Sequence, residues 1–112
     1  MSSVPQTPEE LQEQLFVIFP EYRAHFSGPF HDGPLSFHSV LLGFTPFLSR
    51  KAAACSPTQL KALGQLVNQA VAGGGELQNA CDTCLLEHLH QIGLSKTMRP
   101  FLSQPARLRT RA

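Results

Sequence analysis

Residues 56–75 read SPTQLKALGQLVNQAVAGGG, and this stretch decides the fold class. Ser56 can act as a helix N-cap, and Pro57 suits the first helical position. Gln59 completes an S-x-x-Q capping box. Apolar residues then recur at spacings of three and four as far as the glycine run at 73–75, which predicts the end of the helix. The stretch therefore predicts one helix with a buried face.

The N-terminal segment predicts a second capped helix. Thr7 can act as its N-cap, Pro8 fits the first helical position, and Glu10 completes a T-x-x-E capping box. Apolar residues recur at helical spacing after this start. We expect the helix to end near Phe19, because Pro20 has no backbone N–H to donate.

Three further helices are expected from the spacing of apolar residues. One begins at Ser36 and runs towards Ser49, with its aromatic residues in the core. Another follows the glycine run and continues to Gly93, and a short last helix covers 95–102. Residues 27–34 hold two glycines and two prolines, which predicts a loop. No segment alternates as a strand does, so the sequence predicts an all-α fold, a single compact bundle of four helices plus a short C-terminal fifth helix.

Length and charge bound the domain organisation. A chain of 112 residues has room for one domain, which we place at residues 1–104, followed by a mobile basic tail at 105–112. Nine Lys and Arg against eight Asp and Glu give a net charge of +1, which excludes a uniformly basic nucleic-acid protein. Residues 95–112 nevertheless hold five cations and no acid.

The composition also bears on the cellular compartment. Three cysteines are an odd number, which argues against a disulfide-stapled secreted scaffold and favours a reducing compartment. The longest apolar stretches are too short to span a bilayer, and residues 1–14 lack the features of a signal peptide. We therefore expect a soluble, cytoplasmic protein without a membrane partner.

One cluster of residues could hold a metal ion or carry redox chemistry. Cys81, Cys84 and His88 share a face if their helix is continuous. The same face is the apolar face of that helix, and a free cysteine behaves as a small hydrophobe. A second ligand pair is missing, since Cys55 is the only other thiol. We expect all three residues to pack in the core without a metal or other cofactor; the alternative is a metal-sensing or redox-sensing regulator.

The sequence carries no recognisable catalytic motif. It contains neither a G-x-S-x-G nucleophile elbow nor a phosphate-binding G-x-x-x-x-G-K-[ST] loop. His31 and Asp32 are adjacent in the predicted loop, where functional residues often occur, but a hydrogen bond that orders the loop explains the pair as well. We therefore expect no enzymatic activity and no small-molecule substrate.

Several segments together resemble a known family. Leu15–Glu21 has the pattern L-x-x-x-F-P-E, Ser36–Leu48 reads SFHSVLLGFTPFL, and Leu77–Leu89 reads LQNACDTCLLEHL. Over residues 8–104 the chain resembles a family of small, all-helical bacterial proteins classed as a domain of unknown function. The most specific part of the likeness is N-A-x-x-T-x-x-L-E-x-L in the third segment. The resemblance implies a character similar to that of immunity proteins, which bind and neutralise a cognate bacterial toxin, and it brings no catalytic residues.

Our leading functional hypothesis is accordingly an immunity protein that occludes the active site of a toxin. Toxins that act on nucleic acids have positive clefts, so the partner-binding residues should be acidic or lie beside acids. On this basis we expect the toxin to contact Glu10, Glu13, His31 and Asp32. The glutamates could instead serve only to stabilise the N-terminus of their helix.

A nucleic-acid-binding regulator that uses the arginine tail is the other alternative. A recognition helix needs surface Lys and Arg, yet Lys61 is the only basic residue of the helix after Ser56, and the next helix has none. Taken helix by helix, the sequence therefore disfavours a nucleic-acid partner.

Overall fold

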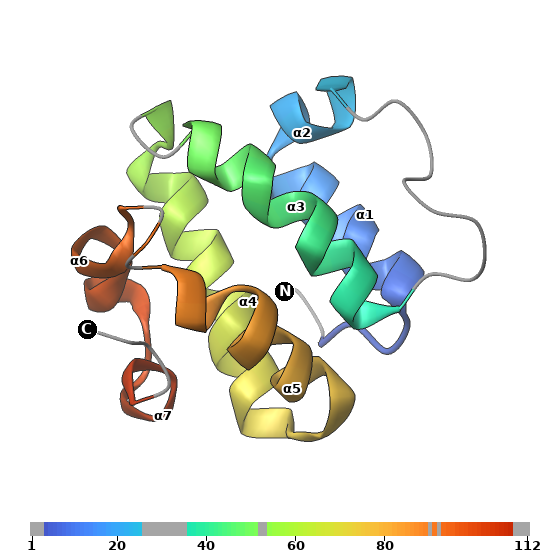
Figure 1. The fold of residues 1–112 in the computed structure, drawn as a ribbon, viewed down its shortest axis with the longest axis vertical. Helices are drawn as coiled ribbons and strands as arrows, with labels where there is room; N and C mark the ends of the chain where they lie inside the picture. Colours follow the sequence, from blue (N-terminus) through green and yellow to red (C-terminus); the bar gives the residue numbers. More distant parts are fainter. Residues whose placement is uncertain (1–3, 26–35, 52–53, 90, 92, 109–112) are drawn as a thin grey trace.

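A computed structural model describes residues 4–25, 36–51, 54–89, 91 and 93–108, and within these ranges every regular element is a helix (Figure 1). The all-α class is therefore confirmed. The α-helices are α1 (Pro8–Ile18), α2 (Pro20–His25), α3 (Phe37–Lys51), α4 (Pro57–Gly73), α5 (Gly75–Cys84), α6 (Ser95–Met98) and α7 (Gln104–Arg107). Two short 3-10 helices are η2 (Leu86–His88) and η3 (Arg99–Phe101). Since the described ranges hold seven α-helices, the expected count of four plus a short fifth is not confirmed.

The two predicted capped starts are confirmed. At α1 the Thr7 hydroxyl accepts a hydrogen bond from the Glu10 N–H at 3.1 Å. At α4 the Ser56 hydroxyl accepts from the Gln59 N–H, and the Gln59 amide oxygen accepts from the Ser56 N–H, both at 3.1 Å. These bonds satisfy N–H groups that the first turn of a helix otherwise leaves without a partner.

A helix that the apolar spacing did not reveal follows α1 directly. The first helix ends at Ile18, as the proline predicted, and Pro20 then begins α2, for which we drew no expectation from the sequence. Proline is well suited to a first helical position, so the residue that ends one helix also begins the next. The bend places Tyr22 in the core, with its ring centroid 5.4 Å from that of Phe16.

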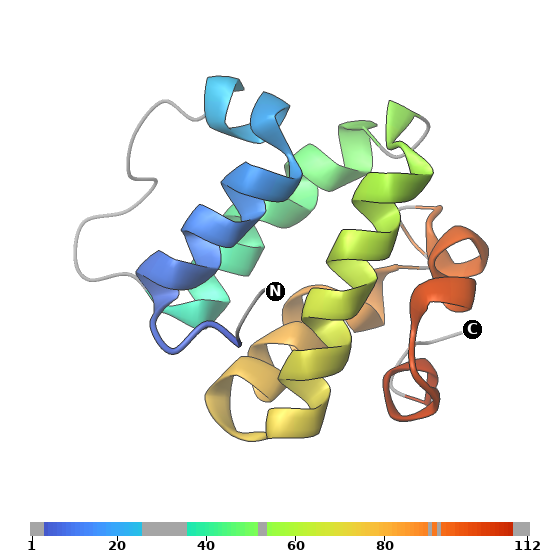
Figure 2. The same cartoon turned by 180° about the vertical axis from the view of Figure 1, so that it is seen from behind.

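The core lies where α1, α3, α4 and α5 meet. Views from both sides place α4 between α1 and the C-terminal helices α6 and α7, and α5 packs against both α3 and α4 (Figures 1 and 2). Gly74 and Gly75, with φ of 71° and 76°, provide the reversal between α4 and α5. The largest side chains that are fully buried are Phe19, Phe44, Leu11, Leu15, Leu41, Leu48, Leu63, Leu85, Leu86, Leu89, Leu94 and Met98. Among the described residues, no helix has the length and apolar character needed to cross a membrane.

The helix after the glycine run is shorter than expected. It ends at Cys84 rather than near Gly93, and Leu85 has φ −128° and ψ −63°, outside the helical region. A tertiary contact lies at this end: the Thr45 hydroxyl of α3 is 2.8 Å from the Cys84 carbonyl oxygen and equally close to the Leu41 carbonyl oxygen of its own helix, so its one proton is shared between them.

The start expected for the basic tail is wrong. Residues 105–107 belong to α7, which packs against α4, and the Ala106 side chain is fully buried. Ser103 caps this helix by accepting from the Ala106 N–H at 3.4 Å, and its own N–H donates to Asn68 of α4 at 2.8 Å. Residues 109–112 and the predicted loop at 27–34 lie outside the described residues.

Candidate partner-binding surface

The structure separates the residues of the possible metal or redox site. Cys81 and Cys84 are buried in α5, with exposed fractions of 2% and 4%, so their expected place in the core is confirmed. His88 lies in η2 and is only partly buried, with Nδ1 2.8 Å from Oε1 of Gln91. The expectation that His88 packs in the core is wrong, because α5 ends before it. In the described part of the chain, no group of three His, Cys, Asp or Glu is placed to hold a metal ion.

The surroundings of Cys81 and Cys55 disfavour the thiolate form. Burial raises the pKa of Cys81 from 9.0 to about 12, and the neighbouring charges of Asp82 and Cys84 act in the same direction. Burial also raises the pKa of the half-buried Cys55, whose thiol donates to the Lys51 carbonyl at 3.1 Å. Since the thiolate is the form that attacks disulfides and binds metals, these surroundings favour a packing role.

The raised pKa of Cys81 predicts a loss of stability in alkali. The thiol of the unfolded chain ionises near pH 9.0, whereas the folded protein retains the proton until about pH 12. The contribution of this thiol to stability is therefore fully present below pH 9. Between about pH 9 and pH 12, its ionisation in the unfolded chain should lower the free energy of unfolding by about 1.4 kcal/mol per pH unit. Urea unfolding at about pH 8 and about pH 10 measures this fall in the free energy of unfolding. In Cys81→Ala the difference between the two pH values should be smaller by about 1.4 kcal/mol than in the parent protein. Equal falls in both proteins would contradict the assignment.

Three glutamates form the acidic side of α1. Glu9, Glu10 and Glu13 are exposed and, with Gln14, line a shallow hollow of about 420 Å³. Glu10 also has a local role, because its carboxylate accepts from the Gln6 N–H at 2.9 Å just before the helix. We refer to Glu9, Glu10 and Glu13 as the acidic edge. Glu10 therefore contributes to the helix start whether or not a partner binds.

Glu13 takes part in a cluster at the corner between α1 and α2. Its carboxylate lies 3.7 Å from the Arg23 guanidinium, and both side chains are about two thirds exposed, at 63% and 66%. The same guanidinium lies 5.4 Å from the centroid of the Phe16 ring, which suits a cation–π contact. An exposed ion pair of this kind contributes about 0–1 kcal/mol to stability, so Glu13 remains accessible to another cation.

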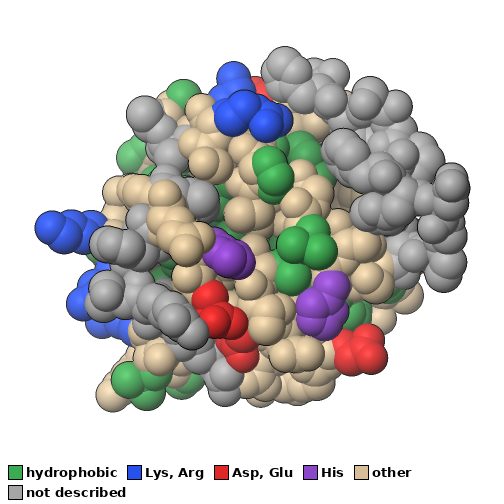
Figure 3. Space-filling view, viewed as in Figure 1, with side chains coloured by type: hydrophobic (Ala, Val, Ile, Leu, Met, Phe, Trp, Pro, Cys, Tyr) green, Lys and Arg blue, Asp and Glu red, His purple; other side chains and the backbone are tan. Residues whose placement is uncertain are grey.

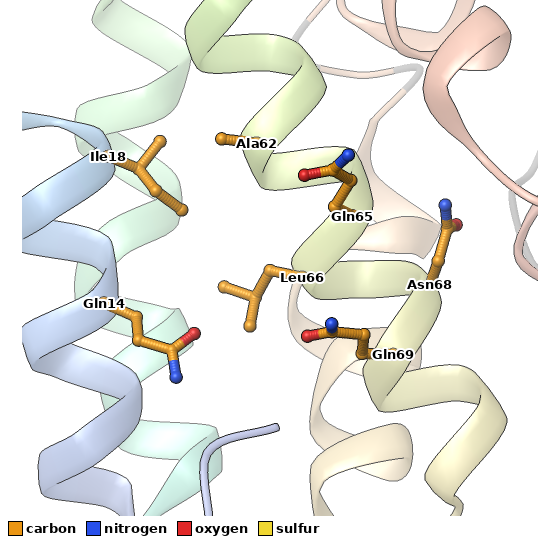
Figure 4. Close-up of a pocket in the computed structure, with 7 residues that line it drawn as sticks. All are labelled: Gln14, Ile18, Ala62, Gln65, Leu66, Asn68 and Gln69. Carbon is orange, nitrogen blue, oxygen red and sulfur yellow. The ribbon is translucent and has the colours of Figure 1, made fainter. Parts of the chain in front are cut away.

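A groove between α1 and α4 adjoins the acidic edge. It has a volume of about 540 Å³ and shares Gln14 with the acidic hollow. Figure 4 shows Gln14 and Gln69 reaching into the space between the helices, with Ile18 and Leu66 forming an apolar part. Both walls are helices that contribute buried residues to the core, so the groove is held on a rigid support. The remaining lining residues are Ala62, Gln65 and Asn68.

A hydrogen-bonded tie joins the two walls. The Gln59 side-chain amide of α4 donates to the Ile18 carbonyl at 3.2 Å and to the Glu21 carboxylate at 3.3 Å. These bonds hold the end of α1 against the start of α4. Hydrogen bonds from its own backbone and from Gln59 lower the pKa of Glu21, so its carboxylate stays ionised at neutral pH.

Of the four expected partner-binding residues, the structure describes two. Glu10 and Glu13 lie one turn apart on α1, whereas His31 and Asp32 lie outside the described residues. Sequence reasoning missed the groove, whose second wall comes from α4. Its sequence signal was the set of amides Gln65, Asn68 and Gln69 in a helix that has no acid. Nothing in that pattern indicates that these residues line a groove beside α1.

Comparison of the chain with models of protein families, with characterised proteins and with solved structures finds no match in any of the three. The likeness to immunity proteins therefore stays a prediction, and the function is argued from the surface itself.

Proposed function

We propose that the protein is a binding module of the immunity type, which neutralises a cognate bacterial toxin domain by covering its active site. The observation that carries this proposal is the groove between α1 and α4 with the acidic edge beside it. A partner could place apolar groups against Ile18 and Leu66 and cationic groups against the glutamates. Surfaces with an apolar centre and charges at the rim are typical of specific protein interfaces.

The charge of the acidic edge fits a toxin that acts on nucleic acids or nucleotides. The active sites of such enzymes carry positive charge, because their substrates carry phosphates. Three exposed glutamates on one side of α1 would speed the encounter with such a cleft and disfavour acidic partners. Of the described residues, Arg23 is the cation that forms an ion pair with this edge, and that pair is weak.

The support beneath the acidic edge is rigid. Leu11 and Leu15 of α1 are fully buried, and the helix start is held by the Thr7 cap. A helix fixed in this way loses little conformational freedom on binding, which favours affinity.

The test begins with the genes that neighbour the one for this protein: a toxin domain encoded there is expressed as a catalytically inactive variant. We expect a one-to-one complex by calorimetry, and we expect co-expression with the active toxin to restore growth. A neighbouring toxin that neither binds nor is neutralised would overturn the proposal.

The acidic edge itself is tested by charge reversal with a matched control. Glu9 and Glu76 are both exposed and each lies in the first turn of its helix, so reversal costs each helix a similar amount. Glu9→Lys combined with Glu13→Lys should weaken toxin binding at least about tenfold at low salt, and the loss should shrink as salt rises. Glu76→Lys should leave affinity within about twofold of the parent. Equal affinities of all three proteins would show that the toxin binds elsewhere.

A further inference from the structure

α4 and the C-terminal segment, which pack against each other, together form a surface to which each contributes cations and neither contributes an acid. α4 contains Lys61, and residues 95–108 contain Lys96, Arg99 and Arg107, but neither segment contains Asp or Glu. All four cationic side chains are exposed. We call these four residues the basic face. Figure 3 shows Lys and Arg side chains projecting from the edge of the molecule where Figure 1 places α6.

Tertiary contacts assemble the basic face from four elements. α4 packs against α6, η3 and α7. The Arg107 Nε–H donates to the Arg99 carbonyl at 3.0 Å, which holds the two residues beside each other. The Asn68 amide of α4 donates to the Phe101 carbonyl at 3.0 Å. Lys61 lies about two helical turns before Asn68 and therefore on the same side of α4.

The geometry points to nucleic acid as the ligand: we propose that the basic face binds its phosphate backbone without reading the base sequence. Several cations without interspersed acids produce a positive potential that attracts polyanions. Thr97 and Gln104 are exposed in the same segment, and such hydroxyl and amide side chains commonly donate to phosphate and sugar oxygens. Four phosphate contacts give weak, strongly salt-dependent binding, with dissociation constants of about 1–100 μM.

An anionic membrane is a poorer match to this surface. Membrane-surface helices need a broad apolar side along several turns. The helices of residues 95–108 are three or four residues long, and Leu108, at 79% exposure, is the one strongly exposed large hydrophobic residue described there. The basic face therefore has little apolar area to insert into lipid.

This inference does not depend on the proposed immunity function. The acidic edge lies on α1, whereas Lys96, Arg99 and Arg107 lie in the C-terminal helices on the other side of α4 (Figure 2), and the groove meets that side only at Asn68. Loss of nucleic-acid binding and loss of toxin binding should therefore arise from different substitutions.

The experiment is fluorescence anisotropy of the full chain with a labelled DNA duplex of about 20 base pairs, titrated between about 50 and 200 mM NaCl. The variant Lys96→Gln with Arg99→Gln removes two cations from the basic face. It should bind about tenfold more weakly at low salt, and the slope of log K against log salt should fall by about two. A second duplex of unrelated sequence should bind with the same affinity as the first.

Arg50→Gln with Lys51→Gln is the matched control. It removes the same charge from the last turn of α3, outside the basic face, and should change affinity less than about twofold. Circular dichroism checks that both double variants keep the helical fold. Equal losses in the two variants would show a general charge effect and overturn the proposal. Vesicles with about one third phosphatidylserine test the alternative that the ligand is an anionic membrane. Binding to these vesicles but not to DNA would also overturn the proposal.

Discussion

Replacing Phe44 by alanine should lower the free energy of unfolding by about 3–5 kcal/mol, the largest effect that we expect from one substitution in this protein. The Phe44 side chain is fully buried. Its ring centroid lies 5.3 Å from those of both Phe19 and Tyr22, and 6.1 Å from that of Phe47. The substitution therefore leaves a cavity where α1, α2 and α3 meet. A domain of this size has about 5–15 kcal/mol of total stability, so the variant should be close to unfolding.

Leu42→Ala in the same helix is the control for this prediction. Leu42 is 59% exposed, and its replacement should change stability by less than about 0.5 kcal/mol. Urea unfolding followed by circular dichroism measures both variants. A loss below about 1 kcal/mol for Phe44→Ala would show that the site collapses around the cavity or that the aromatic cluster is not formed.

The parts of the fold that depend on neighbouring residues were predictable from sequence. The helix starts at Pro8 and Pro57 follow from a hydroxyl cap, a proline and a residue three positions after the cap, all within one turn. The end of α1 follows from the missing N–H of Pro20. These features need no knowledge of the rest of the chain, which is why they were read correctly.

The parts that depend on distant contacts were not predictable. α5 ends at Cys84, whose carbonyl oxygen lies 2.8 Å from the hydroxyl of Thr45, 39 residues earlier in the chain. α7 has a local cap in Ser103, but its packing against α4, which buries Ala106, depends on residues far away in the sequence. A single sequence without homologues does not show which side chains of α3 or α4 face these segments.

The candidate surfaces also differ in whether they could be predicted from sequence. Glu10 and Glu13 were found from sequence because an acidic cluster on one helix is visible as spacing. The groove and the basic face each need α4 together with an element distant in the sequence, α1 for the groove and α6, η3 and α7 for the basic face. The single lysine of α4 therefore does not show on its own that cations of the C-terminal segment lie against the same helix.

Adding a methyl group at Gly64, in the middle of α4, should lower the stability of the protein. Alanine is favoured over glycine in a helix interior by about 1 kcal/mol, so a gain would be expected from sequence alone. A Cβ atom at position 64 would lie 2.7 Å from the Phe101 Cβ and 2.8 Å from the Phe101 carbonyl oxygen. Since backbone atoms cannot rotate away, η3 would have to move, and that movement would strain the hydrogen bond from Asn68 to the same carbonyl.

We therefore expect Gly64→Ala to lower the free energy of unfolding by about 2 kcal/mol, the cost of overpacking a close contact being larger than the gain in helix propensity. A Cβ atom at Gly73, the last residue of α4, would have no neighbour within 4 Å among the described residues, so Gly73→Ala should be neutral or raise stability by up to about 1 kcal/mol. Urea unfolding of the two variants isolates the contact, because each adds the same methyl group to the same helix. Equal stabilities would mean that η3 does not approach α4 as closely as the structure places it. A gap of about 3 kcal/mol would establish that Gly64 is required for the packing that brings Arg99 and Arg107 beside α4.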